Sequence, residues 1–176
     1  MAWRDRRTGS GLADYGDINN LLECVSSYTH EVVSLQAANV WCMRTAAELS
    51  DMEGNSSTAA LLRQEAKALV PRILDLYRPG DGFFDTRYPD ESRRAVRHCY
   101  DFAMVGINIA EELTSQQRAE MLAFFDRELR TPSWMHALSP SDSDAGYSLR
   151  PDHQWNGAYA AWPAECARAA VALGGA

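Results

Sequence analysis

The chain lacks a long basic run, a long hydrophobic run and a signal-peptide pattern. Lys and Arg total 17 against 24 Asp and Glu, and this net charge of −7 argues against nucleic acid or an anionic membrane as a partner. No apolar run approaches the roughly 18 residues that a transmembrane helix needs. From these absences we expect a soluble, cytoplasmic protein.

Sulfur and imidazole ligands are also sparse. No C-x-x-C pair occurs, so the four cysteines are expected to be reduced and mostly buried thiols. The four histidines show no i, i+4 spacing, and G-x-S-x-G and phosphate-loop motifs are missing. We therefore predict no metal and no cofactor. These residues are Cys24, Cys42, Cys99 and Cys166, and His30, His98, His136 and His153.

What the chain does contain is enough apolar sequence for a core. Its 176 residues are 46% hydrophobic and 10% aromatic, values typical of one globular domain spanning residues 1–176. Apolar residues then recur at helical spacing along most of the chain. The sequence therefore predicts an all-α fold.

The first expected helices form an antiparallel pair. Apolar residues beginning at 21 suggest a first helical pattern, and a stronger one starts near residue 29. A turn at 51–57 separates it from a helix over 58–77, in which Pro71 predicts a kink. The apolar faces comprise Leu35, Ala38, Cys42, Ala46 and Leu49, and Leu62, Ala66, Leu69, Ile73 and Leu76.

A small β-hairpin or ordered loop is expected over 82–98, followed by helices at 101–112 and 114–130. Asp101 is the expected N-cap of the helix at 101–112, and Thr114 with Gln117 matches a capping box for the helix at 114–130. The long loop at 131–153 leads to a last helix at 160–173. Pro163 would lie in the first turn of that helix.

The most distinctive stretch is the glycine-punctuated loop over residues 8–17. Gly9, Gly11 and Gly16 permit sharp turns, while Asp14 and Asp17 stand three residues apart. Such a loop can place a carboxylate at the mouth of a cleft. Equally, Asp14 could be a turn acid and Asp17 a helix cap.

Two segments carry a family resemblance. GSGLADYG at 9–16, followed by VSLQAANVW at 33–41, resembles the six-hairpin, (α/α)6-barrel glycoside hydrolases. In their trehalase and processing-glucosidase branches, a Ser-Gly-x-Asp loop carries the catalytic acid. DHQWNGAYAAWP at 152–163 resembles the segment that precedes a late barrel helix and lines the sugar pocket, and DGFF at 81–84 fits a loop after a hairpin.

The resemblance implies glycoside hydrolysis, which uses two carboxylates. Asp14 is the candidate acid, Asp17 the second choice and Glu23 the third. The candidate sugar-binding residues are Tyr15, Arg97, His98, Asp152, His153, Trp155, Asn156, Tyr159 and Trp162. Structural roles are the alternative to sugar binding. Asp152 and His153 could fix the conformation of a loop, and Trp41 is expected to pack in the core rather than against a sugar.

The predicted function is therefore a glycoside hydrolase-like sector of an (α/α)6 toroid that acts on or binds a carbohydrate. A non-catalytic helical interaction module or inactive remnant is the alternative, and a histidine-based sugar epimerase is less favoured because the first loop has no histidine. Five long helices are fewer than a whole barrel holds, so we expect self-association or a missing remainder. The loops at 11–17, 97–101 and 152–159 should share one end, with Asp14 near Tyr15 and Trp155.

Overall fold

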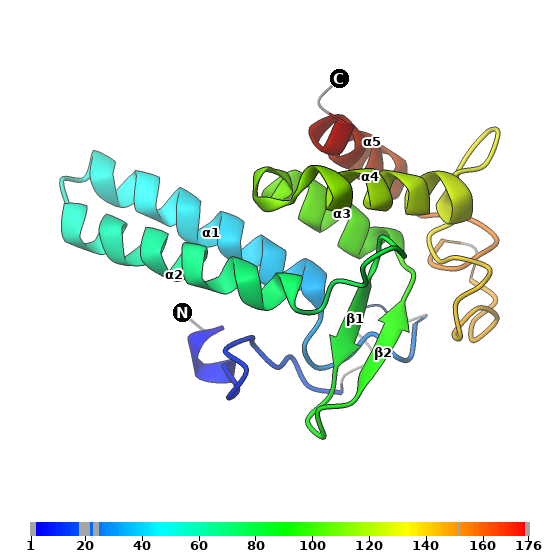
Figure 1. Cartoon of the computed structure of the whole chain (residues 1–176), viewed down its shortest axis with the longest axis horizontal. Helices are drawn as coiled ribbons and strands as arrows, with labels where there is room; N and C mark the ends of the chain where they lie inside the picture. The colour runs from blue at the N-terminus through cyan, green and yellow to red at the C-terminus, as the bar shows by residue number, and fades with distance from the viewer. Residues whose placement is uncertain (1–2, 18–21, 23–24, 151, 175–176) are drawn as a thin grey trace.

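The computed structural model describes residues 3–17, 22, 25–150 and 152–174 (Figure 1). Over these residues the chain forms five α-helices and one two-stranded antiparallel sheet, so a mostly helical fold is confirmed. The cartoon shows the α1–α2 pair projecting to one side, while the long loops and the hairpin lie toward the other.

Helix α1 (Val33–Met52) and helix α2 (Ser56–Leu74) form the predicted antiparallel pair. The turn between them uses Gly54 at φ 77° and Asn55, whose side chain accepts the Thr58 N–H at 3.2 Å and caps α2. Helix α2 continues only three residues past Pro71, whose ring removes one backbone donor.

The start of α1 differs from the sequence-based prediction. Residue 22 and residues 25–32 lie in turns, bends and an isolated bridge, so the helix expected from residue 21 is wrong wherever the structure describes it. Tyr28 and Val25 are buried from within tight turns, with the Tyr28 N–H donated to the Val25 carbonyl. Apolar residues at helical spacing therefore reach the core here without a helix.

Strands β1 (Phe84–Arg87) and β2 (Arg93–Val96) form the predicted hairpin, with Phe84 opposite Val96. Strand β1 is wholly buried, whereas the first two residues of β2 are exposed. The backbone of Glu31 pairs with that of Arg87, so the segment before α1 is fastened to the hairpin.

Helix α3 (Cys99–Asn108) is capped by His98, not by Asp101 as expected. The His98 Nδ1 accepts the Tyr100 N–H at 3.0 Å. Asp101 instead lies buried in the first turn, where it accepts the Ser34 N–H at 2.8 Å and the Tyr28 hydroxyl. Because α1 has no side-chain cap of its own, Asp101 supplies that cap from the neighbouring helix.

Helix α4 (Ser115–Phe124) starts at the predicted capping box of Thr114 and Gln117, and a π-helical turn continues it from Phe125 to Leu129. Helix α5 (Ala161–Gly174) has Pro163 in its first turn, as expected. Helix α5 packs closely on α3, since a Cβ at Gly106 would lie 2.6 Å from the Cβ of Ala169.

Among the helices, α1 packs on α2 and α3, and α3 packs in turn on α5. The apolar faces of α2 and α4 are buried within the chain, with Leu62, Ile73 and Met121 at most 4% exposed. The expectation of a core position for Trp41 is also wrong, because this side chain is 54% exposed. Residues outside the helices, such as Leu12, Phe84 and Met135, join the helix faces in one main core.

Candidate functional site

A buried ion pair between Glu31 and Arg87 anchors the start of the glycine-punctuated loop. Glu31 accepts hydrogen bonds from the hydroxyls of Thr8 at 2.5 Å and Ser10 at 2.8 Å. The Arg87 Nε donates to the other oxygen of Glu31 at 2.7 Å, and both charged side chains are nearly excluded from solvent. This anchor fixes the start of the loop to the hairpin.

The middle of the loop is held by α1. The Gln36 side chain pairs with the backbone of Ala13 in both directions, accepting its N–H at 3.2 Å and donating to its carbonyl at 2.6 Å. One turn further on, the Asn39 amide donates to the Tyr15 hydroxyl at 2.6 Å. Burial raises the pKa of Tyr15, so its hydroxyl stays protonated. Asp14 therefore lies between two fixed neighbours.

Asp14 itself has two partners. Its carboxylate accepts the Gly16 N–H at 2.7 Å and lies 3.1 Å from the His30 Nδ1. The Asp14 side chain is 28% exposed and the His30 ring 17%, so solvent reaches this pair. Asp17 is exposed, and the helix that it was expected to cap falls largely outside the described residues, as does Glu23. Asp14 thus makes the contacts of a turn acid and is also paired with a histidine.

A group of aromatic rings, which we call the aromatic cluster, joins five of the residues around α3 and α5. The Trp162 ring centroid lies 5.0 Å from that of Tyr100, 5.6 Å from His98 and 6.3 Å from His153. His153 stacks in turn on Tyr159 at 6.4 Å and 26°. Four of the five are predicted binding residues that lie far apart in the sequence, and Tyr100 was not predicted.

The aromatic cluster holds buried polar atoms without hydrogen-bond partners in the described part of the chain. They are the His98 Nε2, the Trp162 Nε1 and the His153 Nδ1, the last of which lies 3.2 Å from the Asp152 carboxylate but outside hydrogen-bonding geometry. Burial, with a smaller contribution from His153, lowers the pKa of His98 to about 3. Unpartnered buried polar groups are uncommon, and they mark a place where a polar ligand or water would be stabilising.

The loop and the aromatic cluster meet a common apolar support. A second core cluster consists of Leu22, Val25, Tyr28, Val32, Val96 and Leu138. Tyr15 from the loop, Tyr100 from α3 and Trp162 from α5 all pack on it while remaining partly exposed. The first loop and the first turns of α3 and α5 thus lie against the same six side chains, whereas a shared end for the loops at 11–17, 97–101 and 152–159 stays a prediction.

Arg97 serves a different part of the structure. Its guanidinium lies 3.1 Å from the Glu128 carboxylate and stacks over the Phe83 ring at 4.8 Å, while its backbone N–H donates to Asp142 at 2.7 Å. These contacts tie the end of the hairpin to the π-helical turn after α4 and to the loop that follows it. Since the guanidinium is occupied there, Arg97 is a structural residue rather than a member of the aromatic cluster.

The remaining predicted residues lie in the loop before α5. Asp152 is bound by Arg150 at 2.6 Å, and this hydrogen bond lowers the pKa of Asp152 to about 2. Trp155, at 44% exposure, has no ring partner among the described residues, and Asn156 is exposed. Asp152 therefore fixes its own loop, and a shared pocket of Asp14 and Trp155 stays a prediction.

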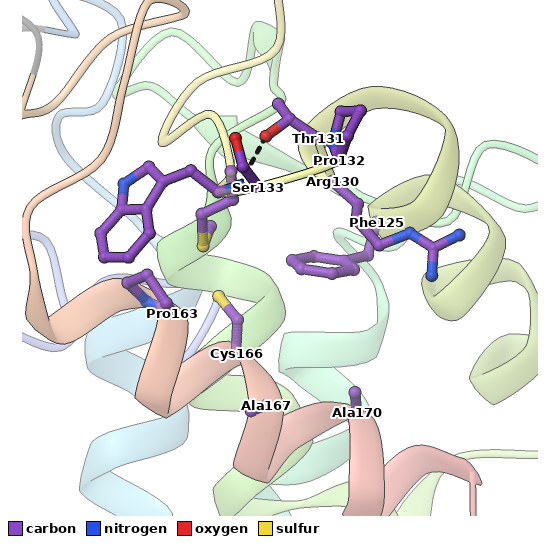
Figure 2. A pocket seen from close by; sticks show the side chains of 11 residues that line it. Phe125, Arg130, Thr131, Pro132, Ser133, Pro163, Cys166, Ala167 and Ala170 are labelled. Carbon is purple, nitrogen blue, oxygen red and sulfur yellow. Dashed lines mark hydrogen bonds between the residues drawn. The ribbon is translucent and has the colours of Figure 1, made fainter.

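A separate apolar pocket of about 370 Å³ opens between α5 and the loop after the π-helical turn (Figure 2). Figure 2 shows Pro163, Cys166, Ala167 and Ala170 along one wall, with Phe125 across from them. Thr131 accepts the Trp134 N–H at 2.9 Å and thereby closes the loop. The lining residues are Phe125, Arg130, Thr131, Pro132, Ser133, Trp134, Met135, Pro163, Cys166, Ala167 and Ala170, none of them a predicted site residue.

Over the described ranges, no group of three or more His, Cys, Asp or Glu side chains is placed to hold a metal ion. No described helix has both the length and the apolarity to cross a membrane. Cys99 and Cys166 are buried free thiols, whereas Cys42 is exposed. Burial, with a contribution from Cys166, raises the pKa of the Cys99 thiol.

Sequence reasoning missed His30, Tyr100 and Asn39. His30 follows Asp14 by sixteen residues, and no spacing rule links an acid to a histidine across an irregular segment. Asn39 lies one helical turn from Leu35 but also one turn from the polar Gln36, so the helical pattern does not single it out. Comparisons with protein-family models, curated proteins and solved structures gave no match, so the site is interpreted from its geometry.

Proposed function

We propose that the protein binds a carbohydrate on the partly exposed rings around its second core cluster, and that it carries out carboxylate-based acid–base chemistry of the glycoside hydrolase kind. The observation behind this is that Tyr15, Tyr100 and Trp162 share one apolar support while Asp14 adjoins Tyr15. Flat aromatic faces with nearby hydrogen-bonding groups suit pyranose rings, whose faces are apolar and whose edges carry hydroxyls.

The unpartnered atoms of the aromatic cluster support a polar ligand. A sugar hydroxyl both donates and accepts, so it could satisfy the Trp162 Nε1–H and the neutral imidazole of His98. An aliphatic ligand would leave both groups unsatisfied. The apolar pocket of Figure 2 offers few such groups, and we therefore place the sugar at the aromatic cluster.

The architecture that we propose is a sector of an (α/α) toroid. Successive odd-numbered helices α1, α3 and α5 pack on one another in order, as the inner helices of such a ring would. Loops that precede helices running in the same direction lie at the same end of the array. This arrangement would bring the loops before α1, α3 and α5 to one mouth.

Sugar binding can be tested by NMR titration of the full chain with trehalose, maltose and maltotriose. The variant Tyr159→Ala removes a ring that is 54% exposed, so the core stays intact. We expect its affinity for the bound sugar to fall roughly five- to tenfold, the loss typical of one stacking ring. Trp41→Ala removes a similarly exposed ring that contacts no ring of the aromatic cluster, so it should leave the affinity unchanged. Equal losses in both variants, or no binding by the wild-type chain, would contradict the proposal.

A helical interaction module is the second candidate, because apolar side chains are exposed near the turn between α1 and α2. Leu49, Met52 and Leu61 are 56%, 83% and 51% exposed. Self-association through this tip would give a dimer in light scattering that the double variant Met52→Ser, Leu61→Ser converts to a monomer. A monomeric wild-type chain would rule out self-association.

A further inference from the structure

We infer that His30 is the proton-transfer residue of the proposed site and that Asp14 is its positioning partner. This assignment rests on the proposed function and changes one part of it, because the carboxylate would act through an imidazole rather than directly. The sequence had placed no histidine in the first loop; the fold brings one there from the segment before α1.

The geometry is that of an oriented imidazole. Both oxygens of Asp14 face the His30 Nδ1, at 3.1 and 3.3 Å, and the Gly16 N–H holds the first of them at 2.7 Å. A carboxylate on one ring nitrogen fixes the tautomer and directs the other nitrogen outward. The His30 Nε2 has no hydrogen-bond partner among the described residues, so it is available to a reacting group.

The backbone at His30 supports a functional placement. His30 has φ 61°, one of two positive values among the non-glycine residues that the structure describes. Its N–H donates to the Gly16 carbonyl at 2.8 Å, and its carbonyl accepts the Tyr15 N–H at 3.0 Å. A non-glycine residue keeps a positive φ only where surrounding contacts hold its backbone in that conformation. Such residues are concentrated at active sites.

The surroundings of His30 also suit a sugar substrate. The centroid of the Tyr88 ring lies 5.4 Å from that of the His30 ring. Tyr15, the residue that follows Asp14, packs on the second core cluster. The His30 ring is mostly covered but 17% exposed, so a substrate can reach it. Asp14 already accepts the Gly16 N–H and faces the His30 Nδ1 with both oxygens, which suits a residue that positions the imidazole.

In the proposed step, protonated His30 gives its Nε2 proton to the oxygen that leaves the anomeric carbon. The C–O bond breaks, and its electron pair remains with that oxygen, which becomes the new hydroxyl. A water oxygen bonds to the anomeric carbon and loses a proton to solvent, from which His30 is reprotonated. An imidazole is suited to this exchange because its ordinary pKa lies near neutral pH.

The test compares two leaving groups in the full chain, using 2,4-dinitrophenyl and methyl glucosides of both anomers. His30→Asn is the variant of choice because asparagine tolerates positive φ and has no proton to transfer near neutral pH. We expect kcat/KM on the methyl glucoside to fall about 10²- to 10⁴-fold, while the dinitrophenyl glucoside, which needs no acid, loses far less. Asp14→Asn should show the same selectivity with a smaller loss, and His136→Asn should match the wild type.

The outcomes separate the inference from the function on which it rests. Absence of both sugar binding and turnover in the wild-type chain would overturn the proposed function. Sugar binding without turnover, or equal losses on the two glucosides in His30→Asn, would overturn the assignment of proton transfer to His30. A loss confined to the poor leaving group, with sugar affinity within twofold of the wild type, would support it.

Discussion

The loop over residues 8–17 and the aromatic cluster differ in how their polar atoms are satisfied. In the loop, hydroxyl, amide and carboxylate groups find partners in Glu31, Gln36 and His30. In the cluster, the His98 Nε2 and Trp162 Nε1 are buried without a hydrogen-bond partner in the described chain. One region is held in a single arrangement by its own contacts, and the other retains unmet hydrogen-bonding capacity.

Under the proposed function, this difference would give the two regions different parts of a binding site. Groups that take part in proton transfer need fixed geometry, which satisfied contacts provide. Groups that recognise a ligand gain most when the ligand supplies a partner that the protein lacks. Changes in the loop should therefore reduce stability through lost contacts, whereas changes in the cluster should alter how stability depends on pH.

The largest effect is expected at the ion pair below the loop. Glu31→Ala leaves the buried Arg87 without its closest carboxylate and frees the hydroxyls of Thr8 and Ser10. Removing one member of a buried pair costs about 3–5 kcal/mol, so urea unfolding should show a loss of that order. Arg63→Ala breaks an exposed pair with Asp51 and should cost less than about 1 kcal/mol. Similar costs for both would mean that the loop anchor is not buried in solution.

The next effect concerns two titrating groups at the start of α3. Burial raises the pKa of Asp101 to about 7, so its contribution to stability falls as pH rises from about 4 to 7. Burial lowers the pKa of His98 to about 3, so its contribution rises between about pH 3 and 6.5. The two slopes have opposite signs over nearly the same range and largely cancel in the wild-type chain.

Single variants separate these slopes. Between pH 4 and 7, the free energy of unfolding of Asp101→Asn should rise relative to that of the wild type. That of His98→Asn, which keeps a capping side chain, should fall relative to the wild type. Each relative change amounts to a few kcal/mol between pH 4 and 7, since one pKa unit corresponds to about 1.4 kcal/mol. Urea unfolding at pH 4, 5.5 and 7 measures it. Parallel profiles for the wild type and both variants would show that neither group is buried as described.

Much of the fold could be predicted because its caps, turns and hairpin are encoded by residues close together in the sequence. The capping box at Thr114, the turn at Gly54 and the hairpin at residues 84–96 each depend on neighbouring residues only. The segment before α1 could not be predicted in this way. Its apolar residues have helical spacing, but Glu31 pairs with the Arg87 backbone and buried turns replace the helix. Tertiary contacts decided the outcome there.

The candidate site divides along the same line. Trp162, His153 and Tyr159 lie in one segment with a distinctive sequence motif, and the structure brings their rings together. The pairing of His30 with Asp14 depends on a loop and an irregular segment meeting in space, which no spacing shows. Arg97 illustrates the reverse error, because a sequence neighbour of a site residue can point toward the Phe83 ring instead.

A smaller effect tests how firmly α1 holds the loop. Gln36→Leu keeps the size of the side chain but leaves the buried N–H and carbonyl of Ala13 unpaired. An unsatisfied buried group costs about 1–3 kcal/mol, so we expect a loss of about 2 kcal/mol and faster amide hydrogen exchange at Ala13. Gln116→Leu removes an exposed hydrogen bond to Glu120 and should change stability little. Unchanged exchange at Ala13 in Gln36→Leu would show that water replaces the glutamine.

The smallest effect distinguishes two glycines of the loop. A Cβ at either Gly9 or Gly16 would meet no atom within 4 Å, so neither alanine variant creates a clash. Gly16 has φ 80°, a conformation that L-residues rarely adopt, and Gly16→Ala should therefore cost about 1 kcal/mol. Gly9 has no such value, and Gly9→Ala should be neutral or stabilise by about 0.5 kcal/mol, since alanine restricts the unfolded chain. Because Gly16 N–H holds Asp14, only Gly16→Ala should also move the His30 imidazole resonances in an NMR spectrum. Equal responses at both positions would mean that the loop samples several backbone conformations, and the contrast with the aromatic cluster would then be lost.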